Sequence, residues 1–286
     1  MPLISSIIAL LMWSITALFL TFCTEIPPFQ ASAWIFLIAV ISILFGQNLL
    51  GHDIQSNWKL PWKLYIFPTA GIIGYMVLLF IGFANAPIFI ANSLNYLWPI
   101  LMFSFALILT KNPLKFNQIF AVILGLIGTL ILFSKDIFYP DEVGTDFILG
   151  ATASLIAAIL WAFYSVQSKK SDFPTGGIAP VFAIGFLICA VLSFVYEGFY
   201  TPNTQEFIFL SLLGITRTSF LFWNYGLKNG SLTQIALLSY FVPTLSMIIL
   251  IIAGFKTSSI EMTVAVLLIT VASIIGNIDQ ILKKLK

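Results

Sequence analysis

Arg217 is the residue of this sequence that points most directly to chemistry. It lies inside an apolar segment, residues 207–227, and it is the only charge deep within any such segment. An arginine at the centre of a bilayer costs about 2.5–3.5 kcal/mol on insertion scales and usually faces a protein interior or a wet cavity. A guanidinium there predicts a two-pronged bond to a substrate carboxylate or phosphate. A structural arginine that bonds helix carbonyls is the alternative.

Polar and aromatic side chains accompany Arg217 along one face of its segment. The residues that share this face at helical spacing are Thr216, Phe220, Trp223 and Asn224. Such a stripe suits a zwitterion, because polar groups would hold its charges while rings take its side chain. Ordinary packing between helices is the alternative, and for Phe220 it is the favoured one.

A second polar stripe lies in the apolar segment 88–109, where its members are Asn92, Asn95, Tyr96 and Pro99. Because Pro99 has no amide hydrogen, the carbonyl of Asn95 loses its helical partner. Pro243 does the same to Ser239 in segment 232–254. Freed carbonyls are tolerated beside neighbouring helices or a water-filled cavity. The two prolines therefore predict paired gating kinks, and bends that only aid packing remain the alternative.

A third group of aromatic residues lies towards one end of segment 147–167. It contains Trp161 and Tyr164, followed by Ser165, and Trp13 is their counterpart in segment 3–22. Tryptophan and tyrosine are commonly interfacial belt residues. Their position within the segments also favours the lining of a cavity, with Tyr75 as a weaker candidate.

The composition indicates that these residues lie in a lipid bilayer. The chain has 286 residues, of which 60% are hydrophobic and 8% charged, whereas soluble domains carry roughly 25% charged residues. Each apolar segment is long enough to cross a bilayer as a helix. We therefore predict an all-α integral membrane protein with ten transmembrane helices, at 3–22, 31–50, 64–84, 88–109, 116–134, 147–167, 177–197, 207–227, 232–254 and 260–278.

Lysine positions predict the orientation of these helices. With the N-terminus inside, only Lys135 and Lys256 fall outside, which is a strong positive-inside signal. An even number of helices then places both termini in the cytoplasm, and we expect a bacterial inner membrane. The lysines on the inner side are Lys59, Lys63, Lys111, Lys115, Lys169, Lys170, Lys228, Lys283, Lys284 and Lys286.

The two halves of the chain resemble each other. Asn85, Tyr96 and Pro99 align with Asn229, Tyr240 and Pro243 at one constant offset. Because five helices are an odd number, the second half must enter the membrane upside down. We predict inverted five-helix repeats at 1–137 and 138–286, which is typical of secondary transporters. Segments 116–134 and 260–278 carry small residues that suit close helix contacts, so we interpret them as scaffold or as the surface of a homodimer.

Several absences narrow the function. Cys23 and Cys189 are interpreted as apolar fillers, and the single histidine, His52, lies in a polar loop. No metal cluster, catalytic constellation, phosphate-binding loop or basic run is found, so we expect no metal, no cofactor, no enzyme and no nucleic-acid partner. No carboxylate lies deep in a segment, which disfavours a carboxylate-based proton relay.

Short motifs give the chain a resemblance to a known family. Asn95-Tyr96-Leu97-Trp98-Pro99 resembles the fourth-helix motif of aromatic amino-acid exporters, in the drug/metabolite transporter superfamily (EamA-like). Trp161-Ala162-Phe163-Tyr164, Trp223-Asn224-Tyr225-Gly226 and Ser239-Tyr240-Phe241-Val242-Pro243 are similar to motifs of its later helices. The resemblance implies a central cavity lined by Asn95, Tyr96, Trp98, Pro99, Trp161, Tyr164, Trp223, Asn224, Tyr240 and Pro243. Arg217 matches none of these motifs.

We therefore expect a secondary carrier that exports neutral amino acids, aromatic ones foremost, by alternating access. Uptake or exchange of another small metabolite, an anionic one paired by Arg217, is the alternative. A membrane protein with no transport role is a remote third. The expected partners are a small-molecule substrate and the lipid bilayer.

Overall fold

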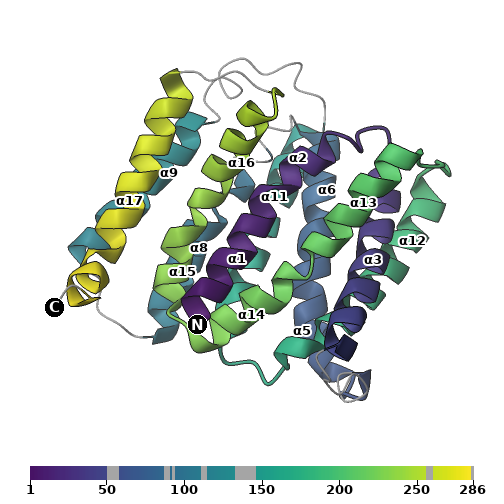
Figure 1. Cartoon of the computed structure of the whole chain (residues 1–286), viewed down its shortest axis with the longest axis horizontal. Helices are drawn as coiled ribbons and strands as arrows, with labels where there is room; N and C mark the ends of the chain where they lie inside the picture. The colour runs from purple at the N-terminus through teal and green to yellow at the C-terminus, as the bar shows by residue number, and fades with distance from the viewer. Residues whose placement is uncertain are drawn as a thin grey trace.

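A computed structural model describes residues 1–49, 58–86, 91, 94–110, 115–132, 146–255 and 260–284. Within these ranges every regular element is helical, as the composition predicts. Asn92 and His52 lie outside the described residues. Residue 1 and the C-terminal end of the last helix lie on the same side of the layer of helices, the lower side in Figure 1, although they are apart along the long axis of the molecule.

Seven helical stretches are long and apolar enough to cross a membrane. Several of them contain more than one helix, because the backbone is interrupted within the stretch. The elements are α1 (Pro2–Ser14) with α2 (Thr16–Leu20), α3 (Pro28–Leu49), α5 (Lys63–Thr69) with the π-helix η1 (Ala70–Gly74) and α6 (Tyr75–Asn85), α11 (Phe147–Gln167), the 3₁₀ turn η2 (Thr175–Gly177) with α12 (Ile178–Tyr196), α13 (Thr204–Thr216) with α14 (Ser219–Asn229), and α15 (Leu232–Ser239) with α16 (Phe241–Ile252).

Three further helices hold shorter apolar stretches, Trp98–Leu109, Phe116–Ile131 and Thr263–Gly276. These helices are α8 (Trp98–Thr110), α9 (Phe116–Leu132) and α17 (Ile260–Lys284). The chain is therefore built to pass through a membrane several times.

The helix that carries Arg217 is interrupted at that residue. The sequence predicts one continuous helix there, but α13 ends at Thr216 and α14 begins at Ser219. Across the junction the backbone bonds span three residues, with the Arg217 amide 3.1 Å from the carbonyl of Gly214. The hydroxyls of Thr216 and Thr218 explain the change, because each bonds a carbonyl three residues back, at 2.7 and 2.8 Å.

The two prolines also take a form that differs from the predicted kinks. Pro243 lies in the first turn of α16, directly after the interruption at Tyr240, and Pro99 is the second residue of α8. The amides of the first helical turn have no hydrogen-bond partner within the helix, so a proline there costs no helical bond. Each proline therefore starts a new helix, and does not bend a continuous one.

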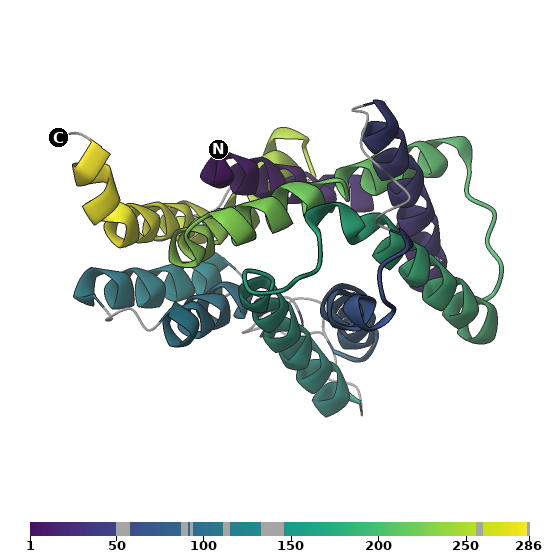
Figure 2. The same ribbon diagram turned by 90° about the horizontal axis from the view of Figure 1, so that it is seen from below.

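Helices α9 and α17 form an uninterrupted pair at one end of the molecule (Figures 1 and 2). Gly128 makes this approach close, because a Cβ at that position would lie 2.9 Å from the Ile269 side chain. The Asn117 amide donates to the carbonyl of Ile275 at 3.2 Å. The close contact agrees with the small residues of the two segments, and bulky apolar side chains such as Ile123 and Leu267 are exposed on the outer face of the pair. Its role as scaffold or as the surface of a homodimer stays a prediction.

Helices α3, α12 and α13 pack together at the opposite end (Figure 1). The Glu197 carboxylate, just after α12, accepts the first free amides of α3, from Phe29 at 2.7 Å and Gln30 at 2.9 Å. The Tyr200 hydroxyl donates to the Glu206 carboxylate at 2.9 Å, and this bond raises the pKa of Tyr200. Carboxylates therefore cap helix N-termini here, where they complement the helix dipole.

Candidate functional site

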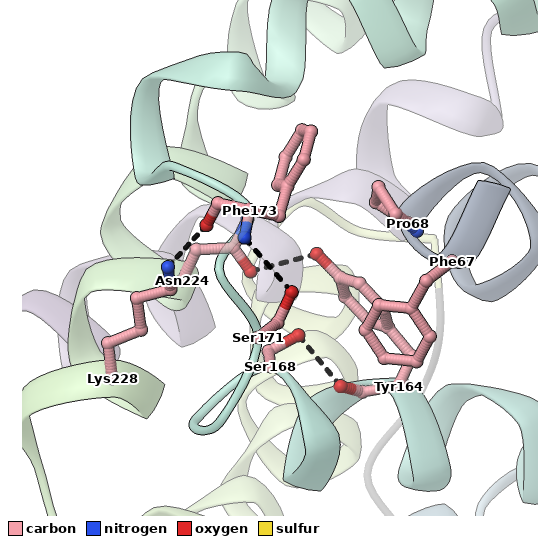
Figure 3. A pocket seen from close by; sticks show the side chains of 8 residues that line it. All are labelled: Phe67, Pro68, Tyr164, Ser168, Ser171, Phe173, Asn224 and Lys228. Atoms are coloured by element: carbon pink, nitrogen blue, oxygen red, sulfur yellow. Dashed lines mark hydrogen bonds between the residues drawn. The ribbon is translucent and has the colours of Figure 1, made fainter. Parts of the chain in front are cut away.

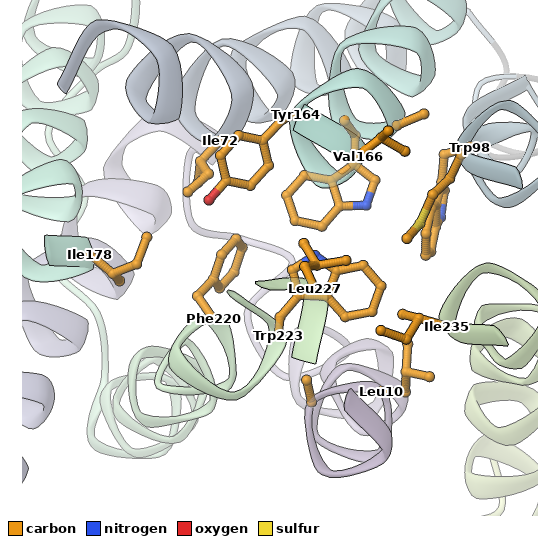
Figure 4. Close-up of a cluster of buried hydrophobic side chains, with 14 of the residues drawn as sticks. Leu10, Ile72, Trp98, Tyr164, Val166, Ile178, Phe220, Trp223, Leu227 and Ile235 are labelled. Carbon is orange, nitrogen blue, oxygen red and sulfur yellow. The ribbon is translucent and has the colours of Figure 1, made fainter. Parts of the chain in front are cut away.

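Five aromatic side chains from distant parts of the sequence meet at the centre of the molecule. We call them the aromatic cluster: Trp13 of α1, Trp98 of α8, Trp161 of α11, and Phe220 and Trp223 of α14. Ring centroids lie 4.9 Å apart for Trp13 and Trp223, and 5.7 Å for Trp161 and Phe220. Figure 4 shows Trp98, Phe220 and Trp223 facing a shared space. Trp13 is partly exposed, and the others are at most 5% exposed.

Helix periodicity explains how α14 delivers its members of this cluster. Phe220, Trp223 and Leu227 are buried at spacings of three and four residues, so they share one face of the helix. The indole N–H of Trp13 donates to the Ser219 hydroxyl at 2.7 Å, which ties α1 to the start of α14. The indole nitrogen of Trp223 is buried with no partner among the described residues.

Trp161 joins the cluster to the predicted residues on α11. Its ring centroid lies 6.2 Å from Trp223, nearly parallel, and 6.3 Å from Trp98. Tyr164, one turn further, lies 5.6 Å away, and its hydroxyl donates to the Asn224 side-chain oxygen at 3.0 Å. Trp98, Trp161, Tyr164, Trp223 and Asn224 were each predicted from the sequence, and the structure brings them together.

A narrow pocket lies beside Tyr164 and Asn224 (Figure 3). Its cavity volume of about 10 Å³ is at the lower limit for one water molecule. Gly71 of η1 borders Tyr164 so closely that a Cβ there would lie 2.5 Å from the ring. The pocket is lined by Phe67, Pro68, Tyr164, Ser168, Ser171, Phe173, Asn224 and Lys228.

Two lysines next to this pocket donate hydrogen bonds that link separate segments of the chain. The Lys169 ammonium donates to the carbonyls of Gly230 at 2.6 Å and Lys228 at 3.3 Å, at the end of α14. The Lys228 ammonium donates to the carbonyl of Phe173, which lies in the loop after α11. Cations suit the C-terminal end of a helix dipole. These bonds fasten α11 and its loop to the turn between α14 and α15.

Three polar side chains border the aromatic cluster, and we call them the polar triad: Tyr75, Asn95 and Arg217. The Asn95 amide nitrogen lies 3.4 Å from the Tyr75 hydroxyl oxygen, and the Tyr75 ring centroid lies 5.3 Å from Trp161. The amide oxygen of Asn95 and the Nε of Arg217 are buried without a partner among the described residues. Unpaired buried polar groups are expensive in folding, so these atoms are candidates to receive a ligand.

Two predicted residues lie away from the aromatic cluster. The Tyr240 ring packs on α9, where a Cβ on Gly125 would lie 3.2 Å from it. Tyr96 packs with Met247 of α16 and Ala265 of α17. In contrast, Trp13 and Tyr75 are members of the site, although sequence reasoning ranked Tyr75 low. In the structure Tyr75 directly follows Gly74 at the end of a π-helical turn, a feature common at functional sites, and the sequence pattern does not reveal this turn.

The fold and this site define a membrane transporter. Residues 1–134 and 148–277 match the EamA-like transporter family, and the chain belongs to that family.

The sequence identity between the chain and individual relatives is modest. The chain is 28% identical to the aromatic amino acid exporter YddG of Ancylobacter novellus, over 91% of each chain. It is 22% identical to the aromatic amino acid exporter YddG of Salmonella typhimurium, over 84% of each. A crystal structure superposes with a TM-score of 0.89 at 26% identity, covering 96% of each chain.

Proposed function

We propose that the chain is a ten-helix secondary transporter that exports neutral amino acids, aromatic ones foremost, across a bacterial inner membrane. The observation that carries this proposal is the aromatic cluster with Arg217 beside it. Aromatic rings offer stacking and edge contacts to an aromatic side chain, while a guanidinium binds a carboxylate. The names of the exporters at 28% and 22% identity point to the same class of substrate.

The proposed topology has both termini in the cytoplasm and two inverted five-helix repeats, 1–137 and 138–286. The excess of lysines on one side supports it, as does the position of residue 1 and the C-terminal end of α17 on the same side of the layer of helices, the lower side in Figure 1. The equivalent tyrosines support the repeats, because Tyr96 packs on α17 of the other half and Tyr240 on α9. The aromatic cluster takes Trp13 and Trp98 from one half and its remaining members from the other.

The interrupted helices support alternating access. The backbone breaks at Ile15, η1, Arg217 and Tyr240 fall within apolar stretches, which is where discontinuous helices of transporters form substrate sites. In this mechanism Arg217 and Asn95 hold the backbone charges of the amino acid, and Trp161, Tyr164 and Trp223 contact its side chain. Tyr96, Trp98, Asn224 and Tyr240 complete the proposed binding residues, with Pro99 and Pro243 at the gating breaks.

The test is counterflow of labelled phenylalanine in proteoliposomes of the purified chain. We expect saturable uptake of labelled phenylalanine, and we expect unlabelled tryptophan and tyrosine to inhibit it by competition. Trp223→Ala should abolish it, whereas Phe222→Ala, at the neighbouring and 38% exposed position, should not. Protein that is folded in detergent yet carries no amino acid would refute the proposal.

The unpaired Nε of Arg217 supports a second candidate, the uptake or exchange of an anionic metabolite. Such a substrate would satisfy the guanidinium without an ammonium group. Counterflow of labelled monocarboxylates, insensitive to phenylalanine, would favour this candidate over the first.

A further inference from the structure

The polar triad lies where three separate helices are interrupted or begin. Tyr75 starts α6 directly after the π-helix, and Asn95 lies just before the turn that leads into α8. Arg217 is the first of the two residues between α13 and α14. Tyr75 and Arg217 keep accessible surface, while Asn95 is 6% exposed. The triad therefore combines irregular backbone with polar side chains next to the aromatic cluster.

Tyr75 is held in place from two sides. Gly71 and Gly74 let η1 approach α11, since a Cβ at Gly74 would lie 3.3 Å from Leu160. The Tyr75 ring then meets Trp161 of α11 with centroids 5.3 Å apart. Asn95 fixes the other end of the side chain through its contact with the hydroxyl. The position of the hydroxyl is thus set by packing, independently of any ligand.

Each member of the triad has a hydrogen-bonding group without a partner among the described residues. Tyr75 accepts from Asn95, and its own O–H is donated to no described residue. The Nε–H of Arg217 also has no partner among the described residues. Arg217 lies one turn before Phe220, whose ring centroid is 5.7 Å from Trp161, and Trp161 is the ring that Tyr75 contacts. The free acceptor is the amide oxygen of Asn95. The triad therefore offers two donors, one of them cationic, and one acceptor.

We infer that Tyr75 is a specificity-determining residue that recognises the carboxylate of an α-amino acid together with Arg217, while the Asn95 oxygen accepts from its ammonium group. This inference rests on the proposed function. A carboxylate can accept hydrogen bonds from both donors. Arg217 alone would bind any anion. The paired hydroxyl and amide oxygen restrict the site to a carboxylate with an ammonium group beside it, and the aromatic cluster takes the side chain.

The decisive variant is Tyr75→Phe, which keeps the ring on Trp161 and removes only the hydroxyl. We expect the inhibition constants of phenylalanine and of 3-phenylpropionate to rise roughly 10- to 100-fold, as for the loss of one hydrogen bond to a charged group. Phenethylamine has no carboxylate, so its inhibition, measured at higher concentration, should be the same in variant and parent. The control is Tyr225→Phe, on the exposed side of α14, which should change none of the three constants.

Two results would overturn the inference while leaving the proposed function intact. One is phenylalanine counterflow in Tyr75→Phe with an unchanged inhibition constant. The other is equal weakening of all three ligands, with a lower unfolding temperature, which indicates a purely structural tyrosine. A parent protein that carries no amino acid refutes the proposed function, and this inference with it.

Discussion

The interrupted helices around Arg217 and the unbroken pair α9–α17 are made of similar apolar residues, yet they differ in backbone and in polar pairing. In the pair, the Thr129 hydroxyl bonds the carbonyl of Gly125 at 2.9 Å and both helices run without a break. At the centre, helices stop and restart, and Arg217 and Asn95 keep unpaired atoms. In a chain this uniformly apolar, a backbone interruption that carries a cationic side chain distinguishes the site from the scaffold, because hydrophobicity cannot.

The comparison predicts its largest effect for Arg217→Ala. Transport of phenylalanine should fall by roughly 100-fold or more, because a charge-assisted pair with a carboxylate contributes about 3 kcal/mol. The unfolding temperature in detergent should stay the same or rise, since the variant removes a charge that has no described partner. Counterflow and thermal unfolding measure the two effects. Unchanged transport would show that Arg217 is a structural residue. The interrupted helices would then differ from the α9–α17 pair in backbone alone, and not in function.

Gly128→Val tests the opposite region. A side chain at this position would meet Ile269 at 2.9 Å and the Ala265 carbonyl at 3.1 Å, and such overpacking costs about 1–3 kcal/mol. We expect a lower unfolding temperature, with the affinity for phenylalanine unchanged in the protein that folds. Gly46→Val is the matched control, because a Cβ at that position on α3 would meet nothing within 4 Å. A change in affinity at Gly128 would contradict the scaffold assignment.

Ser219→Ala probes the link between α1 and α14 and should give a smaller effect. It leaves the indole N–H of the partly exposed Trp13 without its 2.7 Å partner, at a cost of about 1 kcal/mol for the lost hydrogen bond. Transport affinity should fall several-fold, because Trp13 loses its orientation within the aromatic cluster. The control is Ser211→Ala, whose exposed hydroxyl bonds only its own helix. Equal behaviour of the two variants would remove Trp13 from the site.

The smallest expected signal is the reaction of the native Cys23 with maleimide. Burial raises the pKa of the Cys23 thiol to about 11, so roughly one thiol in 10⁴ is ionised at pH 7. Labelling should be very slow at pH 7 and accelerate steadily as the pH approaches 11. Mass spectrometry of the unmodified chain measures it. Fast labelling at neutral pH would contradict the burial of this thiol and show that the α2–α3 loop opens.

Much of the site could be predicted from side-chain type and spacing. Trp161 and Tyr164 are one turn apart on α11, and Phe220 is three and four residues before Trp223 and Asn224 on α14. Helical periodicity alone therefore places the members of each group on one face. Tyr240 could not be placed in this way, because the backbone breaks at that residue and changes the face that follows. The turn at Arg217 depends on threonine hydroxyls that compete with helix bonds. The weight of Tyr75 depends on a π-helical turn that no periodic pattern reveals.

The position of Arg217 also connects the protein to the electrical state of its membrane. The residue lies in the middle of the apolar stretch Thr204–Asn229. A unit charge that crosses the full membrane field gains or loses about 2.3 kcal/mol per 100 mV. In the proposed alternating-access mechanism, the fraction of the voltage drop on each side of the guanidinium changes when the site turns from one side of the membrane to the other. The rate of turnover should therefore depend on voltage, even for a zwitterion that carries no net charge across.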